Sequence, residues 1–93
     1  MDLSVIIVSY NTKELLKKCL SSVLASQTSY KFEVLVSDNG SKDGSLDMVK
    51  REFSQVKLTE NGQNLGFSKG NNVAIKQAAG RLFLLLNSDT EVK

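Results

Sequence analysis

The stretch that decides the fold is Leu3-Ser4-Val5-Ile6-Ile7-Val8-Ser9. It is rich in β-branched residues and almost continuously apolar, which is typical of a strand covered on both faces. Two further runs, 32–37 and 81–86, have the same character, and 56–59 forms a weaker one. The sequence therefore predicts four strands, and the last of them is expected to be buried.

Between the first two predicted strands, apolar residues recur at helical spacing. Asn11 is predicted to cap a helix over about residues 12–26, with Glu14 as its capping-box partner. Cys19 falls in the apolar stripe of this helix, and the chain contains no His that could activate a thiol. We therefore interpret Cys19 as a small buried hydrophobe. The stripe consists of Leu15, Leu16, Cys19, Leu20, Val23 and Leu24.

Two shorter helices are predicted further along the chain. Ser45 is expected to be the N-cap of the second helix, in which apolar residues recur at i, i+3 and i+7. The third begins at Gly66 or Ser68, and Gly80 is expected to end it in the left-handed conformation. The order β-α-β-α-β-α-β predicts an open, doubly wound α/β fold with a mostly parallel, Rossmann-like sheet.

Size, charge and composition exclude several classes of protein. With 93 residues and 41% hydrophobic side chains, the chain is the size of one domain. Its net charge is only +2 and the charges are scattered, so we expect no nucleic-acid partner. A single Cys cannot build a disulfide scaffold, and the apolar runs are far shorter than the roughly 18 residues of a membrane span. These features favour a cytoplasmic protein.

Polar residues follow three of the predicted strands. Ligands of doubly wound sheets bind beyond the carboxyl ends of the strands, where the strand order reverses. If the order is 3-2-1-4, then Asn11, Asp38 and the segment 87–89 lie along one rim. Each carboxylate on that rim could instead be a turn former. Taken together, Asp38 and Asp89 are a pair of carboxylates of which one could accept the imide N–H of a pyrimidine base, and the other could bind Mg²⁺ or Mn²⁺ completed by substrate phosphates.

Three common nucleotide and metal motifs do not fit. Residues 9–12, the turn after the first strand, contain no glycine, which excludes a G-x-G-x-x-G dinucleotide site. Gly40 and Gly44 are four residues apart and are not followed by the Lys of a phosphate loop. A calcium loop beginning at Asn39 would require Glu at its twelfth position, which is Lys50.

Four segments resemble, in order and spacing, the start of glycosyltransferase family 2. The resemblance covers essentially the whole chain. The segments are Val5–Asn11, Val36–Ser45, Asn64–Asn72 and Leu86–Thr90. Within the family, the Asn-x-Gly-Phe and Leu-Asn-x-Asp-Thr forms are most similar to the rhamnosyltransferase-like branch, which often uses dTDP-L-rhamnose.

The resemblance implies the N-terminal half of a GT-A fold and transfer of a sugar, with inversion, from a nucleoside diphosphate to an acceptor hydroxyl. Asp38 would hydrogen-bond uracil or thymine. Asp89 and the neutral Asn87 would hold Mg²⁺ or Mn²⁺ against the diphosphate. The other nucleotide-binding positions that it implies are Val8, Ser9, Tyr10, Asn11, Asn39, Asn71 and Ser88.

The resemblance also implies that residues 1–93 are the nucleotide-sugar-binding half, without the acceptor half. The general base of the family lies well downstream, so we expect this chain alone to bind a dTDP- or UDP-sugar without transferring it. The cut edge of the sheet is expected to favour self-association. Many similar enzymes act on saccharides or lipid-linked saccharides, which would place the full-length enzyme at the inner membrane face.

Two other functions are weighed against this one. A flavodoxin-like or receiver-like module has a similar size and element order, and would be a non-catalytic nucleotide-binding or signalling domain. The uncharged end of the first strand argues against a receiver. A sugar-nucleotide nucleotidyltransferase resembles the chain less, because that class has a Gly-rich, Arg-containing loop where residues 9–12 stand.

Overall fold

The computed structural model describes residues 2–26 and 31–88. The elements follow the predicted order, and the strand boundaries lie within one residue of those expected. They are β1 (Leu3–Ser9), α1 (Lys13–Ala25), β2 (Phe32–Asp38), α2 (Ser45–Glu52), β3 (Lys57–Glu60), α3 (Gly66–Ile75) and β4 (Leu82–Asn87). Within these described ranges, no helix is both long enough and apolar enough to cross a membrane.

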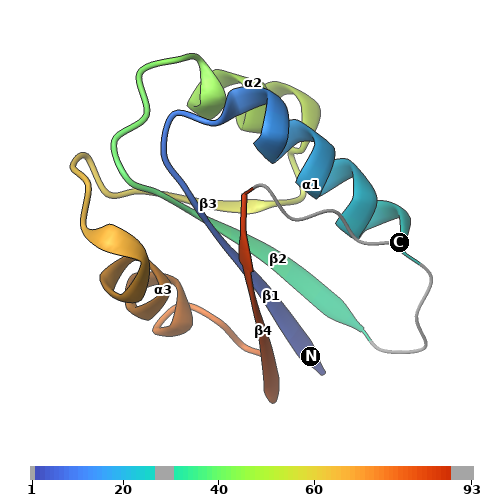
Figure 1. Cartoon of the computed structure of the whole chain (residues 1–93). Helices are drawn as coiled ribbons and strands as arrows, with labels where there is room; N and C mark the ends of the chain where they lie inside the picture. Colours follow the sequence, from blue (N-terminus) through green and yellow to red (C-terminus); the bar gives the residue numbers. More distant parts are fainter. Residues whose placement is uncertain (1, 27–30, 89–93) are drawn as a thin grey trace.

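The strands form one sheet in the order β3-β2-β1-β4, and each neighbouring pair is parallel. Helices α1 and α2 cover one face of the sheet and α3 covers the other, so the sheet is the middle of three layers (Figure 1). The order of strands reverses between β1 and β4. The predicted α/β fold is therefore confirmed, with the carboxyl ends of its strands at one edge.

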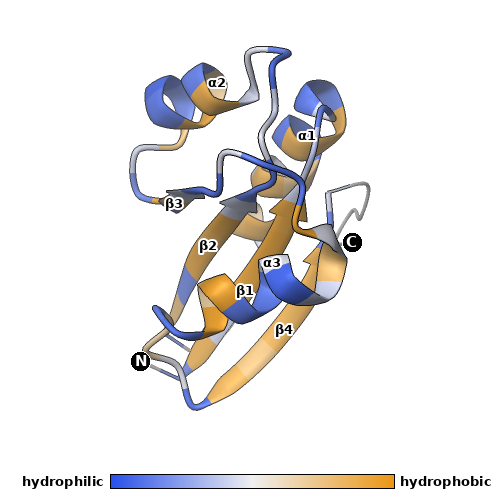
Figure 2. Ribbon diagram, turned by 90° about the vertical axis from the view of Figure 1, so that its left-hand side faces the viewer, coloured by the Kyte–Doolittle hydropathy of each residue, from blue (hydrophilic) through white to orange (hydrophobic). Residues whose placement is uncertain are grey.

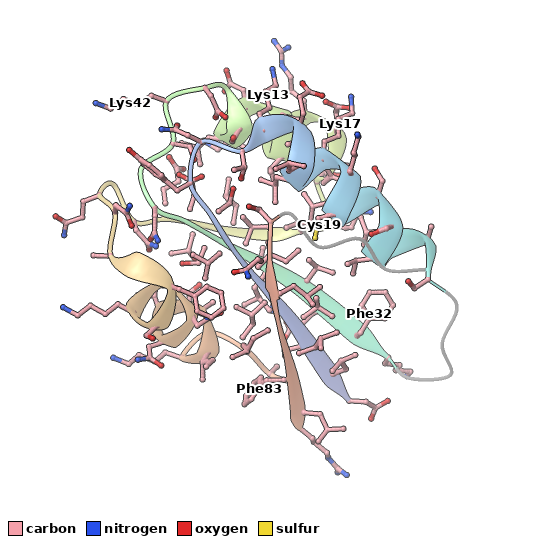
Figure 3. All side chains as sticks on the ribbon, in the orientation of Figure 1. Lys13, Lys17, Cys19, Phe32, Lys42 and Phe83 are labelled. Carbon is pink, nitrogen blue, oxygen red and sulfur yellow. The ribbon has the colours of Figure 1, made fainter. Side chains whose placement is uncertain are left out.

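The core follows the alternation of side chains along the strands. Val5 and Ile7 of β1 pack toward α1 and α2, whereas Ile6 of β1 and Leu35 of β2 pack toward α3. Apolar residues dominate β1, β2 and β4, β3 is mostly polar, and the helices carry polar residues on their outer sides (Figure 2). Cys19 is fully buried between α1 and the sheet, as predicted (Figure 3).

Both predicted helix N-caps are wrong. Thr12, not Asn11, is the N-cap of α1, and the Thr12 side chain makes no capping hydrogen bond. Helix α2 begins at Ser45 itself, one residue earlier than expected, and its N-cap is a left-handed glycine. The Asp43 carboxylate serves both helices instead: Oδ2 accepts the Lys13 N–H at 2.9 Å and Oδ1 accepts the Ser45 N–H at 3.0 Å. For α1 the acceptor comes from a distant loop, which a local sequence pattern does not reveal.

The segment around β4 departs from the prediction in two ways. β4 is not buried: Leu82 is 60% exposed and Phe83 is 46% exposed (Figure 3), because β4 is an edge strand and α3 packs over β1 and β2. Gly80 does not take the left-handed conformation expected of it. A Cβ at this position would lie 2.5 Å from Ser4 Oγ, so the glycine serves the close approach of this segment to β1.

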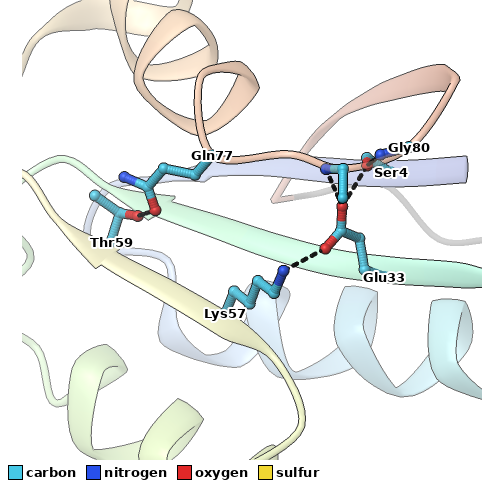
Figure 4. A network of polar contacts seen from close by, with 7 residues as sticks. Ser4, Glu33, Lys57, Thr59, Gln77 and Gly80 are labelled. Atoms are coloured by element: carbon cyan, nitrogen blue, oxygen red, sulfur yellow. Dashed lines mark hydrogen bonds and ion pairs between the residues drawn. The ribbon is translucent and has the colours of Figure 1, made fainter. Parts of the chain in front are cut away.

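A buried carboxylate lies at the amino-terminal end of the sheet, away from the strand ends where a ligand is expected (Figure 4). Glu33 is 8% exposed and accepts hydrogen bonds from Ser4 Oγ, the Ala79 N–H and Lys57 Nζ, each at 2.6 Å. The Gly80 N–H completes the network by donating to Ser4 Oγ at 2.9 Å. Burial by itself raises the pKa of Glu33, but the hydrogen bonds outweigh it and lower the pKa to about 2.

Candidate functional site

A cleft opens at the carboxyl ends of β1 and β4. Its volume is about 440 Å³, within the range of small-molecule sites. The lining is mixed, with two half-exposed aromatic side chains, Tyr10 and Phe67, among amides and hydroxyls. The lining residues are Val8, Tyr10, Thr12, Leu15, Asn39, Asn64, Gly66, Phe67, Asn87 and Ser88. The observed strand order is the one for which the sequence predicts a polar rim at this edge.

Asp38, the last residue of β2, holds a carboxylate beside this rim. The residue is 1% exposed, and its Oδ2 accepts the N–H groups of Gly40 at 3.1 Å and Ser41 at 2.8 Å. Its Oδ1 is buried and has no hydrogen-bond partner among the described residues, and the same is true of Oδ1 of Asn71 in α3. Buried acceptors without partners are unfavourable, so these two atoms mark places where a donor from a ligand would be stabilising.

Asn39 connects β2 to the loop before α3. Its backbone N–H donates to the Ser9 carbonyl at 2.8 Å, which fixes the loop to the end of β1. Its side chain accepts from Asn61 Nδ2 at 2.8 Å and donates to the Gly66 carbonyl at 3.2 Å. The side chain of Asn39 therefore shapes one wall of the cleft.

The turn after β1 is also bonded to the loop after β2. The Asn11 N–H donates to Ser41 Oγ at 2.9 Å, and Asn11 Oδ1 accepts the Lys42 N–H at 2.8 Å. In the same loop after β2, the Asp43 carboxylate accepts hydrogen bonds from the N–H groups of the first residues of α1 and α2. Asp43 is exposed, and its partial desolvation opposes ionisation, but the hydrogen bonds from α2 and α1 outweigh this effect and hold its pKa below the usual value.

The end of β4 supplies the predicted metal-binding segment. Asn87 is exposed and lines the cleft, and the Ser88 hydroxyl lies 2.7 Å from Thr12 Oγ1, which joins β4 to the turn after β1. Asp89 lies outside the described residues. Within 2–26 and 31–88, no three Asp, Glu, His or Cys side chains gather into a metal site. The Asn87 amide is a hard oxygen donor, which fits an ion whose other ligands include phosphate oxygens.

The structure brings half of the predicted nucleotide-binding residues together in the cleft. Those that line it are Val8, Tyr10, Asn39 and Ser88, and those that do not are Ser9, Asn11, Asp38 and Asn71. Lining residues outside the predicted set are Thr12, Leu15, Asn64, Gly66 and Phe67. Leu15 belongs to the predicted buried stripe, yet it is 44% exposed. The Asn-x-Gly spacing is a signal for Asn64, whose Oδ1 accepts the N–H of the left-handed Gly66 at 2.9 Å.

Comparisons of sequence place the chain among proteins of known class. Residues 4–93 match the family described as Glycosyl transferase family 2. The uncharacterized glycosyltransferase YfnE of Bacillus subtilis is 38% identical over 91 residues, which cover 96% of this chain and 23% of that protein. The Escherichia coli UDP-Glc:alpha-D-GlcNAc-diphosphoundecaprenol beta-1,3-glucosyltransferase WfgD is 36% identical over 87 residues, covering 92% of this chain and 34% of that protein. The chain thus spans 23% to 34% of the length of these curated relatives.

Comparisons of structure agree. Staphylococcus aureus TarS 1-349 in complex with UDP has a TM-score of 0.84 and 33% identity, covering 96% of this chain and 28% of that one. The mannosyltransferase PcManGT from Pyrobaculum calidifontis, in complex with GDP-Man and Mn²⁺, has a TM-score of 0.79 and 26% identity, covering 94% of this chain and 27% of that one. The three-layer α/β architecture is therefore shared with both enzymes.

Proposed function

The chain belongs to glycosyltransferase family 2, and from this premise we propose that it binds the nucleoside diphosphate sugar of a glycosyl transfer reaction. The complete enzyme would move the sugar to an acceptor hydroxyl with inversion at the anomeric carbon. The observation that carries the proposal is the buried, unpartnered Oδ1 of Asp38 at the end of β2. It lies one residue before a residue of the cleft, Asn39.

Asp38 would recognise the base. The imide N–H of uracil or thymine is a single donor, and a carboxylate oxygen without a partner is a strong acceptor for it. Because Oδ2 is already fixed by two loop amides, the orientation of Oδ1 is set before the ligand arrives. Tyr10, 47% exposed in the cleft, would offer an aromatic face for stacking on the base. Asn71 would contribute its free Oδ1 to the nucleoside.

The donor nucleotide is proposed to be UDP or dTDP, which present the same imide N–H. Two relatives favour UDP, because TarS is solved with UDP and the name of WfgD includes UDP-Glc. The rhamnosyltransferase-like forms at 64–67 and 86–90 favour dTDP. Asn87 and Asp89 would hold Mg²⁺ or Mn²⁺, and the ion would stabilise negative charge on the departing diphosphate as a Lewis acid.

The rest of the reaction is proposed to depend on residues beyond this chain. An acceptor hydroxyl needs a general base within hydrogen-bond reach, and none of the described cleft residues is a carboxylate or His. We therefore expect residues 1–93 to bind the donor without turnover. The acceptor would be a saccharide or a lipid-linked saccharide, as in the diphosphoundecaprenol-linked sugar named for WfgD. We propose that the complete enzyme acts in the cytoplasm, at the inner face of the membrane when the acceptor is lipid-linked.

Calorimetric titration of the chain with UDP, dTDP and GDP, each with and without Mn²⁺, tests the proposal. UDP or dTDP should bind more tightly than GDP. Asp38→Asn should weaken that binding roughly tenfold or more, because the amide oxygen is needed by the two loop N–H groups, and the amide NH₂ then replaces the acceptor Oδ1 with a donor. The matched control is Asp47→Asn, which changes an exposed carboxylate on α2. Asp89→Ala should remove the dependence on Mn²⁺.

Two results would contradict the proposal. One is a folded wild-type chain that binds none of the three nucleotides. The other is equal affinity of wild type, Asp38→Asn and Asp47→Asn for UDP, which would leave the unpartnered carboxylate oxygen without a role in recognition.

A further inference from the structure

Two loops that meet at the rim of the sheet are hydrogen-bonded through one residue, Asn11. The turn after β1 carries Tyr10, and the loop after β2 begins at Asn39, directly after Asp38. Between them, Asn11 donates its N–H to Ser41 Oγ at 2.9 Å and accepts the Lys42 N–H on Oδ1 at 2.8 Å. We call this pair of hydrogen bonds the loop clip.

The backbone at Asn11 is adapted to this contact. Its φ of 50° places it in the left-handed region, and no other described residue except glycine has a positive φ. Asn tolerates this conformation better than most residues because its short polar side chain bonds nearby backbone groups. Here the amide bonds a loop about 30 residues away in sequence. The residue is exposed and does not line the cleft.

The loop clip leads directly to the base site. Ser41, which accepts the Asn11 N–H, donates its own N–H to Asp38 Oδ2 at 2.8 Å, and Gly40 donates to the same oxygen at 3.1 Å. Asn11 is also the residue that follows Tyr10. One end of the loop clip is therefore the residue that follows Tyr10, and the other end is one hydrogen bond from the Asp38 carboxylate.

We propose that Asn11 is a positioning residue, which holds Tyr10 and Asp38 at the separation that a nucleoside base requires. This inference rests on the function proposed above. It assigns Asn11 a role through the loop clip instead of the direct nucleotide contact predicted from the sequence. Loss of the loop clip leaves both binding groups in place but loosens the contact between the two loops, which the Asn39–Ser9 and Lys13–Asp43 hydrogen bonds still hold on either side of it.

The test compares three variants of the chain by calorimetric titration with UDP. Asn11→Gly keeps the left-handed backbone and removes the acceptor, and should weaken UDP binding roughly three- to tenfold, as expected for one lost hydrogen bond. Asn11→Asp keeps an acceptor oxygen and should restore near wild-type affinity. Ser41→Ala, a second variant at the surface, removes the other half of the loop clip and should behave as Asn11→Gly does.

Ser4→Ala is the control for general destabilisation, because Ser4 lies at the opposite end of the sheet and bonds Glu33. It should lower the urea midpoint without weakening UDP binding. NMR gives a readout without ligand: the amide resonance of Gly40, which bonds Asp38 Oδ2, should shift in Asn11→Gly but not in Ser4→Ala.

The positioning role is overturned if Asn11→Gly binds UDP as wild type does, or if Ser4→Ala loses as much affinity as Asn11→Gly. It is also overturned if Asn11→Asp binds no better than Asn11→Gly. In each case wild type still binds UDP, so the proposed function stands. A folded wild-type chain that binds no nucleotide refutes the proposed function, and the role of Asn11 with it.

Discussion

Replacement of Glu33 by Gln tests how the amino-terminal end of the sheet is stabilised. Folding lowers the pKa of Glu33 from 4.5 to about 2, which at about 1.4 kcal/mol per unit corresponds to roughly 3 kcal/mol. The Lys57 partner is 55% exposed, so solvent screens its share. We therefore expect Glu33→Gln to lower the free energy of unfolding at pH 7 by about 2–3 kcal/mol.

The sign of the pH dependence follows from the direction of the shift. Because folding lowers the pKa of Glu33, the stabilisation is complete above the unfolded value of 4.5 and is lost as the pH falls toward about 2. Urea unfolding of both chains over this range is the assay. The difference in free energy between wild type and Glu33→Gln should be largest at neutral pH and should narrow as the pH falls below 4.5.

Glu14→Gln is the matched control, since Glu14 is exposed on α1. Its free energy of unfolding should stay within about 0.5 kcal/mol of wild type, as is usual for surface substitutions. A difference between wild type and Glu33→Gln that stays constant from neutral to acid pH would refute the reasoning, because it would show that the charge of Glu33 does not contribute.

Three further predictions concern other parts of the fold. Gly80→Ala should lower the free energy of unfolding by at least about 2 kcal/mol in urea, because its Cβ would lie 2.5 Å from Ser4 Oγ and 2.6 Å from Ser4 N; a loss below about 0.5 kcal/mol would contradict this. The chain should self-associate through β4, and Leu84→Lys should reduce the apparent mass in light scattering; a wild-type monomer at high concentration would contradict that. Asp43→Asn should lower the urea midpoint more at neutral than at acid pH, because the lowered pKa of Asp43 provides stability that is lost as the pH falls; an equal effect at both would argue against it.

Much of the fold could be predicted because its signals are local. A continuous β-branched run such as 3–9 predicts a strand, and the apolar residues that recur at helical spacing after it predict a helix, without any information from distant residues. The alternation of these elements restricts the sheet to parallel strands. The burial of Cys19 follows from its place in the helical period, and it is confirmed.

The hydrogen bonds that shape the site could not be predicted from local patterns, because the two partners of each bond are far apart in sequence. Asn11 is a residue type typical of helix N-caps, yet its side chain accepts a hydrogen bond from the Lys42 N–H in another loop. The hydroxyls of Thr12 and Ser88 meet across 76 residues. Such pairs form only when the sheet brings the ends of β1, β2 and β4 together, and no window of sequence contains both members.

By itself the sequence determined the elements, their order and the place of Asp38 at the end of a strand, since each depends on the hydrophobic period of neighbouring residues. Only the tertiary structure decided that Glu33 is an ionised buried group, that Gly80 serves a close approach to Ser4, and that β4 is exposed. The physical reason is that burial and partner geometry depend on which distant segments pack together. Hydrogen bonding and ionisation then follow from that environment.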